Sequence, residues 1–174
     1  MNFNLNAASE KAEPKGPQYQ RPGIYDNVRV SGVNVEKTSV QQIPYLQLQT
    51  TGPNGELGKS GKMFLSTEVK EGKKTSAWSV TARNLTDLIM ATHNVDETAA
   101  KSMINVNSID ELVKVTSTLL VGRPFRAKYK GTENDRGSVY SELAGVESMN
   151  VAKENSRLRF DESRDIVKYV APAP

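Results

Sequence analysis

The 174-residue chain is 37% hydrophobic and 25% charged with a net charge of +3, values typical of one soluble globular domain with polar tails. It has no cysteine and a single histidine, His93, which excludes disulfides and thiolate metal sites and argues against a zinc site or a Ser-His-Asp triad. No run reaches the ~20 apolar residues of a membrane span and no apolar signal core is present, so we expect a cytoplasmic protein without a membrane partner.

The distribution of polar residues divides the chain into three segments. Residues 1–21, rich in Asn, Ala, Glu, Lys, Gln and Pro, predict a flexible N-terminal tail. Residues 22–150 carry the periodic apolar patterns of a folded domain. Residues 151–174 are polar and mixed in charge, which predicts a C-terminal tail. Its segment 166–170 has a brief strand pattern that suits pairing with a sheet edge, the chain's own or a second copy's, so the tail is a candidate for self-association.

The first expected strand covers residues 24–36 and changes phase in its middle. Its apolar residues before and after Ser31-Gly32 fall on opposite alternations, which predicts a β-bulge or sharp bend at that point. A strand bent in this way can serve two sides of a small barrel. Before the bend, Tyr25 and Arg29 are expected to face outward.

A hairpin over residues 43–68 is the expected centre of the fold. Its first arm, residues 44–50, alternates so that Leu46 and Leu48 face the core, while Tyr45 and Gln47 face outward. The second arm, residues 62–67, also alternates. With Met63 and Leu65 in the core, it presents Lys62 and Phe64 on the same outer face as Tyr45. The alternative is the reversed phase, in which Phe64 is buried.

Such an outer face combines aromatic rings with amides and lysines, the usual means of holding a single nucleic-acid strand without reading its sequence. The hairpin connection, residues 51–61, is dense in turn formers and contains Gly58-Lys59-Ser60. This resembles the end of a phosphate-binding P-loop, but Pro53 occupies the position of the required first glycine and no helix follows, so we exclude an NTPase.

Positive charge gathers around this hairpin. Between residues 58 and 74 the sequence has five lysines against two glutamates. Lys73 and Lys74 lie in a loop that leads to Trp78, the only tryptophan. Trp78 is interpreted equally well as a base-stacking residue and as a core anchor. Solvated lysines at strand edges, which discourage aggregation, are the alternative reading of this basic window.

Three helices are expected next. Asn84 is a candidate N-cap of the first and Asn94 its stop, Asp96 a candidate N-cap of a short second helix, and Ser108 opens a capping box for a third that ends at Gly122. These helices are expected to pack against the sheet, and His93 is interpreted as a structural histidine.

Two strands close the domain. In residues 124–130, Phe125, Ala127 and Tyr129 alternate with three cations, so one face is apolar and the other cationic. Arg126 and Lys128 lie on that cationic face. The last strand, residues 139–146, carries Tyr140 and is expected to bend at Gly145.

The order of these elements, with a bent first strand and helices inserted between the third and fourth strands, is that of an OB-fold. Two segments resemble the helix-to-strand-4 and strand-5 region of bacteriophage single-stranded-DNA-binding proteins: residues 119–131 (LLVGRPFRAKYKG) and residues 139–146 (VYSELAGV). The resemblance covers roughly residues 24–149. The expected fold class is therefore mainly β with inserted helices (α+β), a five-stranded OB-fold barrel.

The resemblance implies a non-catalytic protein that binds and protects single-stranded DNA in replication and recombination, in the host cytoplasm, without a cofactor or metal. Its implied partners are single-stranded DNA, further copies of the chain, and replication or recombination proteins. The C-terminus departs from the pattern, because its acids alternate with arginines instead of forming an acidic tip, which puts partner recruitment through it in doubt. The nucleic-acid-binding residues carried onto this chain are Tyr25, Arg29, Tyr45, Gln47, Lys62, Phe64, Lys73, Lys74, Trp78, Arg126, Lys128 and Tyr140.

Other functions are weighed against this one. A structural or assembly module is the main alternative, since OB barrels host many functions. A nuclease would use Glu68 or Glu71 beside lysines, but metal-assisted hydrolysis normally gathers several acidic ligands. RNA stays an alternative ligand, because contacts to its 2′-hydroxyl leave no sequence signature.

Overall fold

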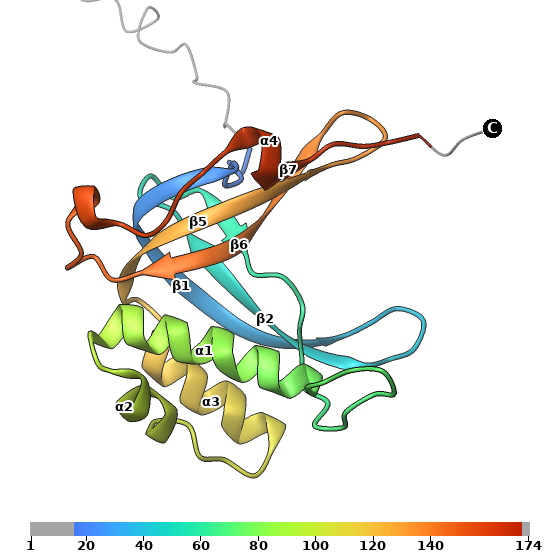
Figure 1. Cartoon of the computed structure of the whole chain (residues 1–174), viewed down its shortest axis with the longest axis vertical. Helices are drawn as coiled ribbons and strands as arrows, with labels where there is room; N and C mark the ends of the chain where they lie inside the picture. Colours follow the sequence, from blue (N-terminus) through green and yellow to red (C-terminus); the bar gives the residue numbers. More distant parts are fainter. Residues whose placement is uncertain (1–15, 172–174) are drawn as a thin grey trace, which may run out of the picture.

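The computed structural model describes residues 16–171, which form a mainly antiparallel sheet with helices packed against it (Figure 1). The α+β prediction is confirmed. The described strands number seven instead of the expected five, in the main-path order β3-β2-β1-β5-β6. In chain order they are β1 (Gly23–Lys37), β2 (Pro44–Thr51), β3 (Leu57–Lys59), β4 (Met63–Phe64), β5 (Pro124–Glu133), β6 (Val139–Glu147) and β7 (Ile166–Val167).

The long strand β1 connects the two halves of the sheet. It pairs antiparallel with β2 on one side and with β5 on the other. The register with β2 shifts between Val30 and Gly32, which confirms the predicted bulge. A second bulge lies between Tyr25 and Val28, where Asn27 adopts a left-handed φ of 57°. Because an extra residue reverses the alternation, the two bulges decide which side chains of β1 face the core.

The expected hairpin forms, but its second arm is broken into two short strands. Both β3 and β4 pair antiparallel with β2, and residues 60–62 separate them. The predicted connection at residues 51–61 is therefore shorter, because Leu57–Lys59 already belongs to the sheet. An isolated parallel bridge joins Ser60 to Leu143 of β6. This bridge brings the far ends of the strand path together.

Three helices lie between β4 and β5: α1 (Ala77–His93), α2 (Glu97–Ser102) and α3 (Ile109–Leu120). The predicted N-caps Asp96 and Ser108 and the left-handed stop at Asn94 are confirmed. The start of α1 was predicted too late. Ser76, not Asn84, caps the helix by accepting the Ser79 backbone N–H. Ser76 is a favourable N-cap residue, so α1 gains two turns that include Trp78.

The core fills the space between the sheet and the helices. The predicted inward residues of β2 and β5 are fully buried: Leu46, Leu48, Phe125, Ala127 and Tyr129. The helices add apolar side chains from their sheet-facing stripes, including Leu85, Leu88 and Ile89 of α1 and Leu112 and Leu120 of α3. His93 packs here too, and its Nε2 lies 2.8 Å from the Leu119 carbonyl oxygen, a contact that ties α1 to α3.

Residues at both ends of the described chain pack on this sheet. Of the expected N-terminal tail, residues 1–15 lie outside the described residues, while Gln18 and Gln20 exchange backbone hydrogen bonds with Leu57 of β3. After β6, the chain passes through a 3₁₀ turn (Lys153–Asn155) and α4 (Glu162–Asp165) to β7, which pairs in parallel with β5. Among residues 16–171, no helix has the length and apolar character of a membrane span.

Candidate nucleic-acid interface

The outer face of β2 and its partner strands brings two predicted residues, Tyr45 and Phe64, onto one surface with Gln49 and Lys59, which were not predicted as site residues. Tyr45 lies opposite Phe64 of β4, and Gln49 lies opposite Lys59 of β3. Leu46 and Met63, the neighbouring pair, are buried. The predicted phase of both arms is therefore confirmed, and the reversed phase of the second arm is wrong. Tyr45, Phe64, Gln49 and Lys59 share one face, because residues separated by an even number along a strand lie on the same side.

Tyr45 is covered by its own neighbours. Only 6% of it is exposed, because the Phe64 ring packs edge-on with centroids 5.9 Å apart and the Lys62 Nζ lies 5.2 Å from the Tyr45 centroid. The Tyr45 hydroxyl donates to Glu36 Oε2 at 2.9 Å, and this hydrogen bond raises the Tyr45 pKa. The expectation that Tyr45 offers an open stacking surface is wrong. Its ring is instead a packing surface for the Phe64 ring and the Lys62 side chain.

Phe64 borders a groove of about 780 Å³, which we call the loop groove. Three parts of the chain line it: the β1–β2 loop, the loop between β4 and α1, and the first turns of α1. In Figure 1 these two loops project from the same end of the molecule. The lining residues used below are Val40, Phe64, Glu68, Lys70, Lys73 and Val80.

The β1–β2 loop is braced by its own hydrogen bonds. The Thr38 N–H donates to the Ile43 carbonyl, and the Ile43 N–H donates to Thr38 Oγ1, both at 3.0 Å. Gln42, at a left-handed φ of 54°, donates its side-chain amide to the carbonyls of Thr38 and Ser39. One wall of the groove is therefore fixed before any ligand arrives.

The groove combines apolar surface with positive charge. Val40 is 89% exposed and Val80 49% exposed, and Phe64 is half-buried in the same lining. Lys70 and Lys73 line the same groove against one carboxylate, Glu68. Lys74 is exposed on the same loop as Lys73. A flat ring beside lysines suits a nucleobase with its phosphate.

Sequence reasoning missed part of this groove. Val40 was passed over because its loop is otherwise polar, and Val80 because the start of α1 was placed after it. An aliphatic side chain in an otherwise polar loop is a sequence signal that could have identified Val40 as part of a binding surface. Lys70 belonged to the basic window but was not singled out.

Trp78 lies in the first turn of α1, half-buried against the core cluster. Its backbone N–H donates to the Ser66 carbonyl at 2.9 Å, and Thr81 Oγ1 donates to the Phe64 carbonyl at 2.7 Å. Of the two readings of Trp78, the structure favours the core anchor. These bonds fix β4, and with it Phe64, to the helix.

Arg126, predicted as a nucleic-acid-binding residue, is only 4% exposed. Its Nε donates to Asp26 at 2.6 Å and its Nη1 to Glu147 at 2.9 Å and to the Val151 carbonyl at 3.0 Å. These contacts hold the Asp26 pKa below its ordinary value, the hydrogen bond from Arg126 being the main cause. The expectation that Arg126 is open to a ligand is wrong, since the side chain is buried and its Nε and Nη1 are hydrogen-bonded within the protein.

Lys128 is neutralised in a similar way. Its Nζ lies 2.7 Å from Asp165 Oδ2, and Lys130 reaches the other oxygen of the same carboxylate at 3.5 Å. The hydrogen bond from Lys128 lowers the Asp165 pKa, and the Asp161 backbone N–H adds to the effect. On the cationic face expected on β5, Lys128 is thus paired with the segment that ends in β7, whereas Lys130 stays exposed.

Tyr25 and Arg29 lie away from the loop groove. The bulge of β1 turns Tyr25 toward the core, where its ring packs edge-on against Tyr129 with centroids 6.1 Å apart. Its expected outward orientation is therefore wrong. Arg29 is exposed as expected, and its guanidinium donates to the Gly122 carbonyl, just beyond the end of α3.

Gln47 and Tyr140 line a different groove, at the other end of β2. Gln47 is half-buried on the outer face, and its Nε2 donates to the Ser60 carbonyl at 3.1 Å. Tyr140, at the start of β6, is 62% exposed.

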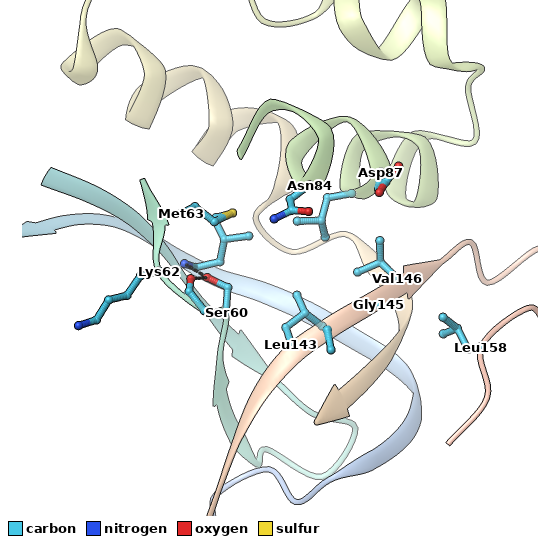
Figure 2. Close-up of a pocket in the computed structure, with 13 residues that line it drawn as sticks. Ser60, Lys62, Met63, Asn84, Asp87, Leu143, Gly145, Val146 and Leu158 are labelled. Carbon is cyan, nitrogen blue, oxygen red and sulfur yellow. Dashed lines mark hydrogen bonds between the residues drawn. The ribbon is translucent and has the colours of Figure 1, made fainter. Parts of the chain in front are cut away.

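A separate cavity of about 430 Å³ lies between α1, β6 and the segment before β4 (Figure 2). Leu143, Val146 and Leu158 give it an apolar wall, and Asn84 and Asp87 of α1 stand at its border. Burial raises the Asp87 pKa. Lys62 is among the residues that line this cavity, but in Figure 2 its side chain extends away from it. A carboxylate without a facing lysine is a poor phosphate site, so this cavity is not the candidate interface.

In the part of the chain that the structure describes, no cluster of three or more His, Cys, Asp or Glu residues suits a metal ion. The comparisons with known proteins add no family: no protein-family model matches this sequence, and no match is found among curated proteins.

Proposed function

We propose that this chain is a non-catalytic protein that binds single-stranded DNA with little sequence preference and protects it during replication or recombination. The observation that carries the proposal is the loop groove. There Phe64, Val40 and Val80 offer apolar surface to bases, and Lys70 and Lys73 stand beside them for the phosphates. Lys62 and Lys74 lie next to this surface.

We further propose that the sheet closes as an OB-fold barrel. Support comes from the strand pairing, in which β1 joins β2 to β5 and the helices separate β4 from β5. The parallel bridge between Ser60 and Leu143 is the contact through which such a barrel would close. In OB-folds, oligonucleotides bind across strands 2 and 3. The outer face of β2, β3 and β4 is the corresponding surface here.

The place in phage DNA metabolism rests on the resemblance of residues 119–131 and 139–146 to bacteriophage single-stranded-DNA-binding proteins. Host cytoplasm as the compartment and replication or recombination proteins as partners rest on the same resemblance.

Two physical terms would drive binding. Stacking contributes on the order of 1–3 kcal/mol per base on an aromatic ring. Lysines that neutralise phosphates release counterions, so the logarithm of the affinity falls with the logarithm of the salt concentration, by about 0.7 per phosphate contact on a single strand. Neither term depends on base identity. Binding should therefore be steeply salt-dependent and tolerant of sequence.

Fluorescence anisotropy with a labelled thymidine oligonucleotide tests this proposal, with a matched duplex and several salt concentrations. We expect tight binding to the single strand, weaker binding to the duplex, and a steep decrease with salt. Phe64→Ala should weaken single-strand binding about five-fold or more. Absence of single-strand binding at low salt would contradict the proposal and favour an assembly module.

A further inference from the structure

A second groove, at the opposite end of β2 from the loop groove, has the composition of a nucleic-acid site. It has a volume of about 630 Å³, and we call it the tyrosine groove. Its lining includes Tyr19, Gln47, Gln49, Lys59, Val139 and Tyr140. Tyr19 is 70% and Tyr140 62% exposed, and the described residues that line the groove include no carboxylate.

The backbone on both sides of Tyr19 is held by hydrogen bonds, while its ring is exposed. The Leu57 N–H donates to the Gln18 carbonyl at 2.8 Å, and the Gln20 N–H donates to the Leu57 carbonyl at 2.7 Å, so backbone hydrogen bonds flank Tyr19 on both sides. Ser141 of β6 donates its hydroxyl to the Gln20 carbonyl. The segment 18–20 therefore joins β3 to β6, and it places Tyr19 in the lining of the groove that also contains Tyr140.

The tyrosine groove and the loop groove lie on one continuous face. The Tyr45–Phe64 pair and the Gln49–Lys59 pair are four residues apart along β2, with Gln47 between them on the same side. At about 3.3 Å per residue, this separation is about 13 Å. Amide side chains, which hydrogen-bond base edges, therefore connect an aromatic and lysine-lined groove at one end to another at the opposite end.

We propose that the single strand bound by this protein runs along the outer face of β2 and occupies both grooves, with Tyr19 and Tyr140 stacking bases and Lys59 contacting a phosphate at the second. The inference rests on the proposed function and extends it. It assigns a binding role to a segment N-terminal to the first strand. It also requires the full site to span more nucleotides than the loop groove alone holds.

The test is a ladder of labelled thymidine oligonucleotides from about 4 to about 16 nucleotides, the range of site sizes of OB-folds, measured by anisotropy at one salt concentration. The double variant Tyr19→Ala/Tyr140→Ala and the single variant Lys59→Ala are compared with Phe64→Ala. Tyr169→Ala is the matched control, because Tyr169 is 46% exposed and lines neither groove.

For the wild type, affinity should increase along the ladder. The double variant should lose about five-fold or more on the longest oligonucleotides and much less on the shortest, and Lys59→Ala should change in the same direction. If Phe64→Ala weakens binding while both tyrosine-groove variants match Tyr169→Ala along the whole ladder, the second groove is refuted and the proposed function stands. If the wild type binds no oligonucleotide, both are refuted. Weakening by the tyrosine-groove variants alone would support the second groove and reject the first.

Discussion

The hydroxyl of Tyr129 is buried in the centre of the sheet. It lies 2.6 Å from Thr50 Oγ1, and both residues are almost fully buried. Burial raises the Tyr129 pKa to about 12, against the opposing effect of the Thr50 hydrogen bond. This pair connects β2 to β5 across the core and therefore lies beneath the outer face on which both grooves are built.

Replacing Tyr129 by Phe should change how stability depends on pH. At pH 7 the variant leaves the Thr50 hydroxyl without its partner, at a cost of about 1 kcal/mol. The Tyr129 hydroxyl holds its proton more tightly in the folded chain than in the unfolded one. The free energy of unfolding of the wild type is therefore unaffected by ionisation of this group below pH 10, and it falls by about 2–3 kcal/mol between pH 10 and pH 12 as the unfolded chain ionises. Urea unfolding at pH 7 to 12 should show the variant's deficit shrinking or reversing. A constant difference would contradict this account.

Arg126 illustrates how a residue that looks like a ligand contact can be structural. Its side chain satisfies the buried Glu147 carboxylate as well as Asp26. Arg126→Ala would leave the buried Glu147 carboxylate without its ion-pair partner, with the Arg157 backbone N–H still donating to it, so we expect a loss of about 3 kcal/mol in the free energy of unfolding. The control is Arg123→Ala, which removes an exposed cation three residues before Arg126 and should change stability by less than about 0.5 kcal/mol. Equal effects of the two variants in urea unfolding would show that the buried network contributes little.

Among the secondary-structure elements, the segment after β6 is held against β5 by the ion pairs of Asp165. Asp165→Asn should weaken the ion pairs with Lys128 and Lys130 and loosen residues 161–167. Hydrogen exchange of these amides should accelerate, whereas Glu162→Gln, which alters an exposed carboxylate of the same helix, should leave them unchanged.

The same attachment should depend on pH. The Asp165 pKa is lowered from its ordinary 3.8, so its contribution is complete at neutral pH and is lost as the pH falls through the lowered value. Exchange of residues 161–167 in the wild type should therefore approach that of Asp165→Asn only below about pH 4. Loosening that begins near pH 6 would point to a different titrating group.

The lysines of the loop groove should contribute measurably to oligonucleotide binding. Lys73→Ala should weaken oligonucleotide binding and reduce the salt slope by about 0.7, the value for one phosphate contact on a single strand. Lys114→Ala removes an exposed lysine of α3, outside the groove, and should leave both quantities unchanged. A salt slope unaffected by Lys73→Ala would remove this lysine from the interface.

For the whole molecule, local patterns predicted much of the fold. Alternation along β2 and β5 identified the buried side chains correctly, and capping residues located the starts of α2 and α3. These features depend on neighbours within a few residues, which the sequence displays directly. The bend of β1 at Gly32 was visible for the same reason, because a phase change is a local signal.

The errors arose where distant residues meet. Arg126 and Asp26 are 100 positions apart, and no local sequence pattern predicts their ion pair. Tyr25 was assigned outward by alternation, but the bulge at Asn27 reverses it. Tyr45 does lie on the predicted face, yet Glu36, Lys62 and Phe64 cover it. The face on which the side chains of β2 and β4 lie was thus predicted by alternation, while the exposure of individual side chains depended on tertiary packing that a single sequence does not encode locally.

The central claim is that a single strand of DNA lies in the loop groove. Photocrosslinking with a bromodeoxyuridine oligonucleotide, followed by mass-spectrometric mapping of the modified peptides, tests it most directly. The account predicts crosslinks on the peptides that contain Phe64 and residues 38–43, reduced by competition with unlabelled thymidine oligonucleotide and by Phe64→Ala. Crosslinks confined to α2 and α3 or to the cavity beside Asp87, with Phe64 and the β1–β2 loop unmodified, would contradict it.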